Sequence, residues 1–408
     1  MRGFQIVLVM FLLVAGLDVY SQKTQSALRN LWETIVAQDD YEKNFRFPAF
    51  IDSLKDIEGF EEVDSLNHWL PSDWSYAIAG DSSIIVMAGI LPYELEPNRL
   101  IWLVQQQSDH SRLSAFTTQL SASSVGRAQP NVQLVSYELA NKPFVSLSIS
   151  VGTSLVFDLP DLYTQLVLQD LVESRMDDEK LLYSQQLWTR MEILLGHEAL
   201  FKHDFSGYEQ VSTLQSADGI IKVTTWNLEF ENGTNAFRGA VAVNLDGKVV
   251  VHELKDNYQA IKNPEQASLS TASWFGAVYY QIIEHSYRRN TYYTMLGYNP
   301  NNPFSKIRVI EVMSLAPNGT PRFGNAILEV DGRSKRRIIL EYSNRVSMML
   351  RYDARERMIV MDNLVPSAPM FHNDFRHYGP DFTHNGFRFE KGKWVFMDNI
   401  ELRNTRVR

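Results

Sequence analysis

Six pairs of asparagine or aspartate followed by glycine recur in the second half of this chain and constrain its fold more than any other feature. Both positions of such a pair tolerate the positive φ angles that two-residue β-hairpin turns require. The pairs begin at Asp218, Asn232, Asp246, Asn318, Asp331 and Asn385. Apolar and polar residues alternate around them, as over 337–342, which is typical of strands with one buried face. We therefore expect residues 208–408 to form a mostly antiparallel β domain of about a dozen strands, closed as a barrel, a sandwich or a similar fold.

The first half of the chain shows a mixed pattern. Apolar residues follow the helical spacing i, i+3, i+4 from Leu28, again after Asp161 and again over 178–195, and Gly196 is expected to end that last helix as a left-handed cap. Strand-like runs lie at 75–79, 83–91, 99–105, 132–139 and 144–157. We expect residues 22–207 to form an α+β domain with flanking helices, so that the whole chain is α+β.

The N-terminus has the pattern of a cleavable secretory signal peptide. Arg2 supplies a positive start, residues 3–17 are mostly apolar, and Val19-Tyr-Ser21 fits a cleavage site. The apolar stretch is shorter than the roughly 20 residues that a membrane-spanning helix needs. We expect residues 1–21 to be removed and the mature chain to be periplasmic or secreted, without a transmembrane segment.

Composition limits what can stabilise the fold and suggests where it divides. The chain has no cysteine, so stability must come from packing rather than from disulfides. Its 408 residues exceed the size at which one core keeps growing, which favours two domains. Residues 22–207 carry 13 basic and 26 acidic residues, and residues 208–408 carry 25 and 21, giving net charges of −13 and +4. This contrast indicates either a boundary near residue 208 or simply acidic surface helices in the first half.

Several short motifs in the second half carry a family resemblance. They are Ser216-Ala-Asp-Gly219, Val223-Thr-Thr-Trp226-Asn227, Tyr292-Tyr-Thr-Met-Leu-Gly-Tyr298, Arg351-Tyr-Asp353, Tyr378-Gly-Pro-Asp381 and Gly392-Lys-Trp394. With these motifs, residues 208–408 resemble an uncharacterised family of exported proteins of Bacteroidota. The resemblance implies an envelope or secreted location, and it brings no activity, cofactor or catalytic residue with it.

A segment near the C-terminus holds the densest group of potential metal ligands in the sequence. It contains His372, Asp374, His377, Asp381 and His384, which are residue types that bind zinc or another divalent ion. Their spacing matches no established zinc signature, and a hydrogen-bonded loop before the last hairpin is the alternative. We expect no metal, and these five residues are the candidate ligands if one is bound.

Other patterns that could indicate an enzyme or a charged ligand are incomplete. His197 lacks a second histidine at i+4, where Phe201 stands, so the two ligands of a metalloprotease helix cannot share one face. The sequence contains neither a nucleophile elbow nor a dinucleotide-binding glycine motif. The basic run over 333–337 is expected to be the solvated start of a strand, with a phosphate or anionic-lipid site as the alternative. We expect no cofactor.

Three kinds of function stay open from the sequence. The first is non-enzymatic binding of a peptide, a glycan or another envelope protein, with Tyr292, Tyr293, Tyr378 and Asp381 as candidate contacts, because exposed aromatic residues make binding platforms. The second is a hydrolase of unrecognised type acting on polysaccharide or peptide. The third is a structural subunit of a larger assembly. The motifs lean against an enzyme, export argues against nucleic acid as a partner, and the oligomeric state stays open.

Overall fold

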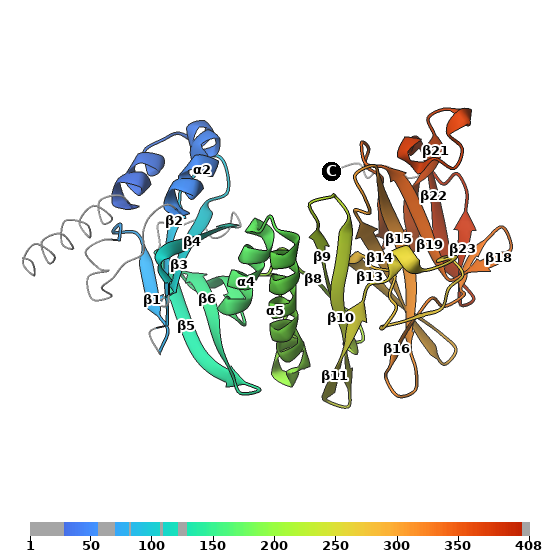
Figure 1. The fold of residues 1–408 in the computed structure, drawn as a ribbon, viewed down its shortest axis with the longest axis horizontal. Helices are drawn as coiled ribbons and strands as arrows, with labels where there is room; N and C mark the ends of the chain where they lie inside the picture. Colours follow the sequence, from blue (N-terminus) through green and yellow to red (C-terminus); the bar gives the residue numbers. More distant parts are fainter. Residues whose placement is uncertain (1–27, 56–69, 81–82, 107–108, 121–128, 402–408) are drawn as a thin grey trace, which may run out of the picture. The chain divides into compact units, whose positions relative to one another are not determined.

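The computed structural model describes residues 28–55, 70–80, 83–106, 109–120 and 129–401, without the side chains of 109–112. The predicted signal peptide, residues 1–21, lies outside these ranges. The chain divides into two compact units, Met1–Leu166 and Val167–Arg408, and strands predominate in both (Figure 1). The predicted β-rich α+β class is confirmed at this level. The division precedes residue 208, where charge and pattern change, so the segment 167–207 groups with the second unit.

The first unit packs two helical segments against a meander sheet. Residues 28–36 are helical, as their apolar spacing predicts, and α2 (Asp40–Lys55) follows. The sheet consists of β1 (Ser75–Ile78), β2 (Ile84–Leu91), β3 (Arg99–Gln106) and β4 (Asp109–Gln119) in that order. A core of buried side chains joins helices and sheet, and it includes Leu28, Trp32, Ile35, Phe50, Leu54, Ile85, Met87, Ile101 and Leu103.

A second meander completes this unit. It contains β5 (Pro130–Leu139), β6 (Lys142–Val151) and β7 (Ser154–Leu159). The run 144–157, read from the sequence as one strand, is therefore two strands that turn at Gly152, whose φ is +61°. Helix α4 (Leu162–Glu173) follows β7, and Asp161 accepts a hydrogen bond from the Thr164 amide at 2.9 Å. Asp161 is thus the N-cap that the sequence indicated.

The second unit contains three sheets. The first has the order β11-β10-β9-β8, from β8 (Ser212–Gln215), β9 (Ile221–Glu229), β10 (Asn235–Leu245) and β11 (Lys248–Lys255). The second has the order β12-β16-β15-β14-β13, from β12 (Leu269–Ser270), β13 (Val278–Tyr287), β14 (Asn290–Asn299), β15 (Ser305–Leu315) and β16 (Pro321–Phe323), with β19 (Arg337–Ser343) paired to β15.

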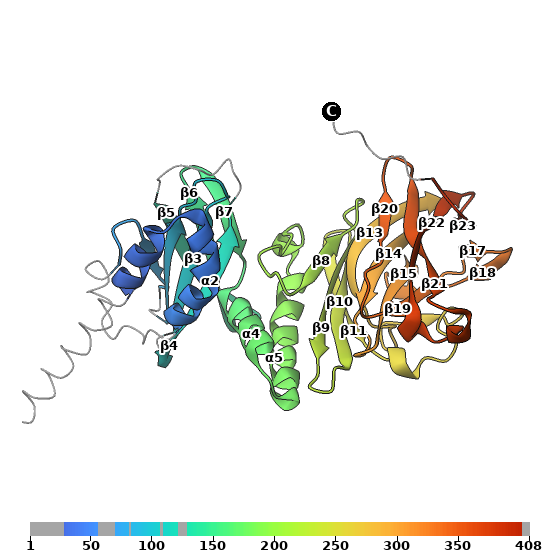
Figure 2. The same ribbon diagram turned by 90° about the horizontal axis from the view of Figure 1, so that it is seen from above.

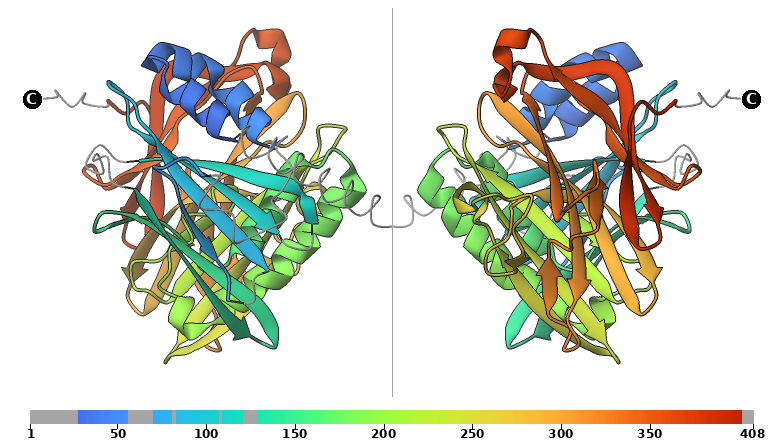
Figure 3. Two further views of the ribbon diagram at one scale, coloured as in Figure 1. Left: turned by 90° about the vertical axis from the view of Figure 1, so that its left-hand side faces the viewer. Right: turned by 90° about the vertical axis from the view of Figure 1, so that its right-hand side faces the viewer.

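The third sheet has the order β18-β17-β23-β22-β21-β20. Its strands are β17 (Leu328–Val330), β18 (Arg333–Lys335), β20 (Leu350–Asp353), β21 (Met358–Pro366), β22 (Tyr378–Glu390) and β23 (Lys393–Met397). Pairing is antiparallel except between β17 and β23. Short 3-10 turns are η3 (Glu198–Leu200), η4 (Tyr258–Ala260), η5 (Pro369–Phe371) and η6 (Phe375–His377). The segment with η5 and η6, red in Figure 3, lies at one end of this sheet.

The second sheet is buried on both faces, because two apolar cores lie on either side of it. Tyr293 and Met295 of β14 join a core with residues of β9 and β10. Leu296, which points to the other face, joins a core with Ile359 of β21 and Trp394 of β23. The middle sheet therefore depends on its register, since a shift by one residue would exchange its two faces.

Helix α5 (Asp177–Gly196) packs on the first sheet of this unit (Figure 2). Its buried side chains include Leu187, Trp188, Met191 and Leu195. The Trp226 indole of β9 donates to the Ser184 hydroxyl at 3.3 Å, and Arg238 of β10 donates to the Ser184 carbonyl at 3.1 Å. These contacts explain why α5 belongs to the second unit, although it is acidic like the first half of the chain.

Five of the six predicted turns are found, but only Asp246-Gly247 and Asp331-Gly332 are two-residue turns with positive φ at both positions. In the range 208–401, all of which is described, five of the six pairs form hairpin turns whose glycines have positive φ. Asn385-Gly386 is the error, because it lies inside β22 and pairs with β21. A Cβ on Gly386 would lie 2.7 Å from the Ile359 carbonyl oxygen, so glycine is needed there for close strand approach. The last hairpin turns at Lys391-Gly392, with φ of +49° and +86°.

One further expectation is wrong, and another is correct only in part. Gly196 is the last residue of α5 and lacks a left-handed conformation, and the helix ends at His197 with extended backbone. The basic run over 333–337 is solvated only at its start: Arg333 and Ser334 are exposed in β18 as expected, but Arg337 is fully buried against Glu311. Sequence alternation placed Arg337 on a polar face, whereas both faces of this sheet are covered. Within the described ranges, no helix combines the length and apolarity needed to cross a bilayer.

The packing of α5 predicts how the chain can be divided. A fragment of residues 167–408 should unfold cooperatively, whereas residues 208–408 should melt at a clearly lower temperature or aggregate. The shorter fragment exposes the sheet face that Trp188 and Met191 cover, and each such side chain contributes about 1.5–3 kcal/mol when buried. Circular dichroism melting of both fragments is the measurement. Equal melting temperatures would contradict the role assigned to α5.

Candidate functional site

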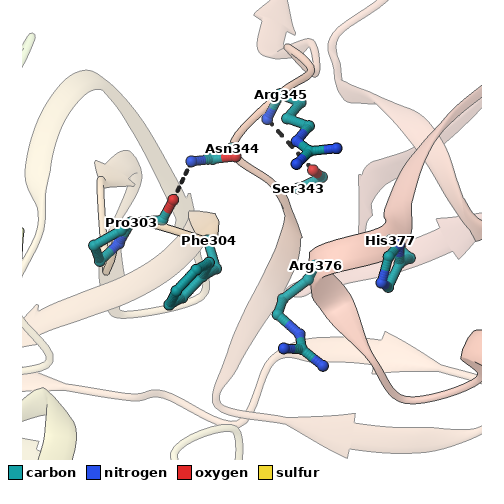
Figure 4. Close-up of a pocket in the computed structure, with 7 residues that line it drawn as sticks. All are labelled: Pro303, Phe304, Ser343, Asn344, Arg345, Arg376 and His377. Atoms are coloured by element: carbon teal, nitrogen blue, oxygen red, sulfur yellow. Dashed lines mark hydrogen bonds between the residues drawn. The ribbon is translucent and has the colours of Figure 1, made fainter.

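A cavity of about 370 Å³ opens in the second unit. Its size falls within the roughly 300–1,000 Å³ of small-molecule sites. The lining residues come from three segments and are Pro303, Phe304, Ser343, Asn344, Arg345, Arg376 and His377. Figure 4 shows the turn that precedes β15 on one side, the end of β19 above, and η6 on the other side. The cavity is thus formed by a strand end and by turns around the middle sheet.

The turn before β15 presents an aromatic ring to the cavity opening. The Asn302 side-chain oxygen accepts hydrogen bonds from the Phe304 amide at 2.8 Å and the Ser305 amide at 3.2 Å. This arrangement fixes the backbone locally. The Phe304 ring is 62% exposed, so a phenyl group stands at the surface on a backbone that is hydrogen-bonded in place.

The end of β19 is tied to the same turn. The Asn344 amide donates to the Phe304 carbonyl at 3.1 Å, and the Asn344 side chain donates to the Pro303 carbonyl. The Arg345 amide donates to the Ser343 hydroxyl at 3.3 Å. Two sides of the cavity are therefore connected by hydrogen bonds.

Arg345 carries a positive charge and forms no ion pair with any described residue. Its side chain is exposed, and no ion pair or side-chain hydrogen bond of Arg345 is found among the residues that the structure places. An unpaired guanidinium presents planar N–H donors that match carboxylate and phosphate geometry. Arg345 is the residue in the lining with the greatest unused capacity to bind an anion.

Arg376 is partly used by a neighbouring carboxylate. Its Nε and one Nη donate to the two oxygens of Asp374 at 2.8 Å and 2.7 Å. These bonds lower the pKa of Asp374 and raise the pKa of Arg376. The neighbouring His377 ring stacks on Phe371, with centroids 3.9 Å apart. Asp374 thus orients Arg376 while the remaining Nη group stays available.

The lining has a positive balance. It includes Arg345 and Arg376 but neither aspartate nor glutamate, and Asp374 offsets one of the two positive charges from outside the lining. A cavity with unpaired positive charge favours an anionic ligand. The arrangement can therefore hold a negatively charged group, and it offers no carboxylate for acid–base chemistry.

The five candidate metal ligands do not form one cluster among the described residues, although His377 Nε2 lies 3.8 Å from Asp374 Oδ2. Asp374 pairs with Arg376, and Asp381 accepts hydrogen bonds from Thr383, which lower its pKa. His384 Nδ1 lies 3.0 Å from Asp362 Oδ1, and His372 is exposed. Across the described ranges, no group of three or more histidine and acidic side chains is arranged to hold a metal ion.

The candidate binding residues also lie apart. Tyr293 is buried, and its hydroxyl donates to Asp218 at 2.7 Å; burial and this bond raise its pKa. Tyr292 lies beside His285. The Tyr378 hydroxyl accepts from the Asn373 amide at 3.1 Å, so this tyrosine supports the segment that carries η6. Of all candidates from the sequence, His377 alone is a lining residue of the cavity.

Sequence reasoning missed the four lining residues that define the cavity chemically, which are Phe304, Asn344, Arg345 and Arg376. The signal available was weak, because Asn301-Asn302-Pro303 indicates a turn but not what that turn contacts. We found no protein-family model and no curated protein that matches this sequence. The function must therefore be argued from the geometry of the chain itself.

A largely buried histidine, His285, lies between the middle and third sheets. His285 of β13 contacts the rings of Tyr292, Phe389 and Trp394. Its Nε2 lies 3.3 Å from the Thr294 hydroxyl, whereas its buried Nδ1 has no hydrogen-bond partner among the described residues. Burial lowers the pKa of His285 to about 4. The ring is therefore neutral near pH 7 and becomes costly to protonate in the folded state.

This histidine predicts acid sensitivity. The folded pKa of about 4 lies below the unfolded value of about 6.5. The stability that the neutral His285 ring contributes is therefore full above about pH 6.5 and is lost as the pH falls toward 4. Between pH 7.5 and pH 5 the free energy of unfolding of the wild type should fall by about 2 kcal/mol more than that of His285→Gln. Urea unfolding at both pH values measures this. The exposed His372→Gln variant should behave as wild type, and a parallel pH dependence of wild type and His285→Gln would refute the assignment.

Proposed function

We propose that the protein is an exported, non-enzymatic binding protein whose ligand site is the cavity between Phe304, Arg345 and Arg376. The observation that carries this proposal is the unpaired Arg345 in a lining that contains no carboxylate. Hydrogen bonds from Asn344 join the segments on two sides of the cavity. Such preorganisation lowers the entropic cost of binding.

The proposed location follows from the sequence. Residues 1–21 have the pattern of a signal peptide, and the chain contains no cysteine. The likeness of residues 208–408 to exported proteins of Bacteroidota supports the same location. We therefore assign the mature protein to the periplasm or the extracellular space, with a peptide, a glycan or another envelope protein as the partner and without a cofactor.

The lining favours binding over catalysis. A typical glycosidase needs two carboxyl groups flanking the bond to be cleaved, and the cavity lining contains none. A serine nucleophile needs an adjacent base, but the Ser343 hydroxyl accepts the Arg345 amide at 3.3 Å, and no described contact joins it to His377. A hydrolase acting on polysaccharide or peptide is the alternative that these features support less well.

We also propose that the three sheets of the second unit stack as layers rather than close into a barrel. The support is that the two apolar cores lie on opposite faces of the middle sheet. Layers about 10 Å apart are typical of packed sheets. In such an arrangement the cavity lies at the end of β19, where the middle sheet meets the segment that precedes β22.

Array binding tests the proposed site. Fluorescently labelled residues 22–408 should bind a subset of a mixed peptide and glycan array, and Arg345→Glu should abolish that binding because it reverses the unpaired charge. Arg355→Glu is the matched control, because it makes the same charge change at an exposed turn position outside the lining. Equal binding by wild type and Arg345→Glu would contradict the proposed site, provided that their melting temperatures agree.

A further inference from the structure

We propose that the cavity binds the carboxylate of an acidic sugar, with the sugar ring against Phe304. This inference rests on the proposed function and names the ligand class of the same site. It is supported by the charge of the lining, the exposed aromatic residue at the rim, the remaining hydrogen-bonding groups, and a lining that consists mostly of turn and 3-10 residues.

The charge of the site fits a group with one negative charge. Arg345 is unpaired, whereas two N–H groups of Arg376 already donate hydrogen bonds to Asp374. Because Asp374 offsets the charge of Arg376, the site has about one net positive charge, which is that of Arg345. A carboxylate carries a single charge and accepts two parallel hydrogen bonds from a guanidinium. A phosphate, with up to two charges, would be neutralised less completely by one unpaired cation.

Phe304 supplies a flat apolar surface beside these charges. Its ring is 62% exposed, and its backbone is fixed by Asn302 at 2.8 Å and by Asn344 at 3.1 Å. A single exposed apolar side chain is ordinary on a protein surface, but beside a cavity it offers an apolar contact to a ligand. The C–H face of a pyranose ring is a partner of matching shape and polarity.

The other lining groups can recognise hydroxyls. The Asn344 side-chain nitrogen donates a hydrogen bond to the Pro303 carbonyl. This bond orients the amide group and leaves its oxygen as an acceptor. The Ser343 hydroxyl and the His377 ring nitrogens add groups that donate or accept. A sugar acid presents a carboxylate and several hydroxyls on one ring, so a single residue of it can use every class of group in this lining.

The backbone around the cavity argues against an extended peptide. Peptides are commonly bound by adding a strand to an exposed sheet edge. Here Ser343 is the last residue of β19, and the other lining residues lie in turns or in η6. The lining therefore presents side chains rather than a row of backbone donors and acceptors, which is the arrangement that suits a ring-shaped ligand.

Calorimetry with residues 22–408 tests this assignment. The probes are trimers of galacturonic, glucuronic and mannuronic acid, the matching neutral hexose trimers, and a short acidic peptide. At least one acidic trimer should bind more than about tenfold tighter than its neutral counterpart, and higher salt should weaken that binding. Phe304→Leu and Arg345→Glu should each reduce it by about tenfold or more, whereas Phe304→Trp and Arg355→Glu should retain it.

The outcomes separate this inference from the function on which it rests. Binding of a neutral trimer or of the acidic peptide, lost in Arg345→Glu and without a preference for sugar acids, would overturn the ligand class and leave the cavity as the binding site. Binding that Arg345→Glu does not change would overturn both. Each variant is compared at equal melting temperature, so that loss of folding is not mistaken for loss of contact.

Discussion

The ion pair between Glu311 and Arg337 is the interaction on which the second unit depends. Both side chains are completely buried, and they meet through two hydrogen bonds of 2.7 Å and 2.8 Å. Arg337 also donates to the carbonyls of Pro264 and Ala267, which ties the segment before β12 to the middle sheet. Burial raises the pKa of Glu311 although Arg337 opposes the shift. The pair is thus costly to desolvate, and we infer that it specifies the register more than it adds stability.

This register connects the core to the proposed site. Glu311 lies opposite Arg337 at one end of the β15–β19 pairing, and Ser305 lies opposite Ser343 at the other end. Glu341 reinforces that second end by accepting a hydrogen bond from the Ser305 hydroxyl at 2.5 Å. Because Ser343 lines the cavity, we infer that the Glu311–Arg337 pair at the opposite end of this pairing helps to position Arg345. A rigid scaffold of this kind holds binding loops in place without further support.

The sequence predicted the parts of the fold that local chemistry determines. Turn pairs such as Asp246-Gly247 were correct because positive φ at both positions is a local property. Helix α2 was missed because it contains Pro48 and buries few apolar residues. The burial of Arg337 and the cavity could not be predicted, because both arise where segments distant in the sequence meet. Asn385-Gly386 failed for the same reason, since its glycine is required by the neighbouring strand.

A double-mutant cycle on Glu311 and Arg337 tests the central claim most directly. Glu311→Leu and Arg337→Met should each lower the free energy of unfolding by about 3–5 kcal/mol, because each leaves one buried charge unpaired. The double variant should recover most of that loss, since neither charge is then buried alone. Additive losses in the double variant, or single losses below about 1 kcal/mol, would contradict the view that this pair fixes β19 on β15.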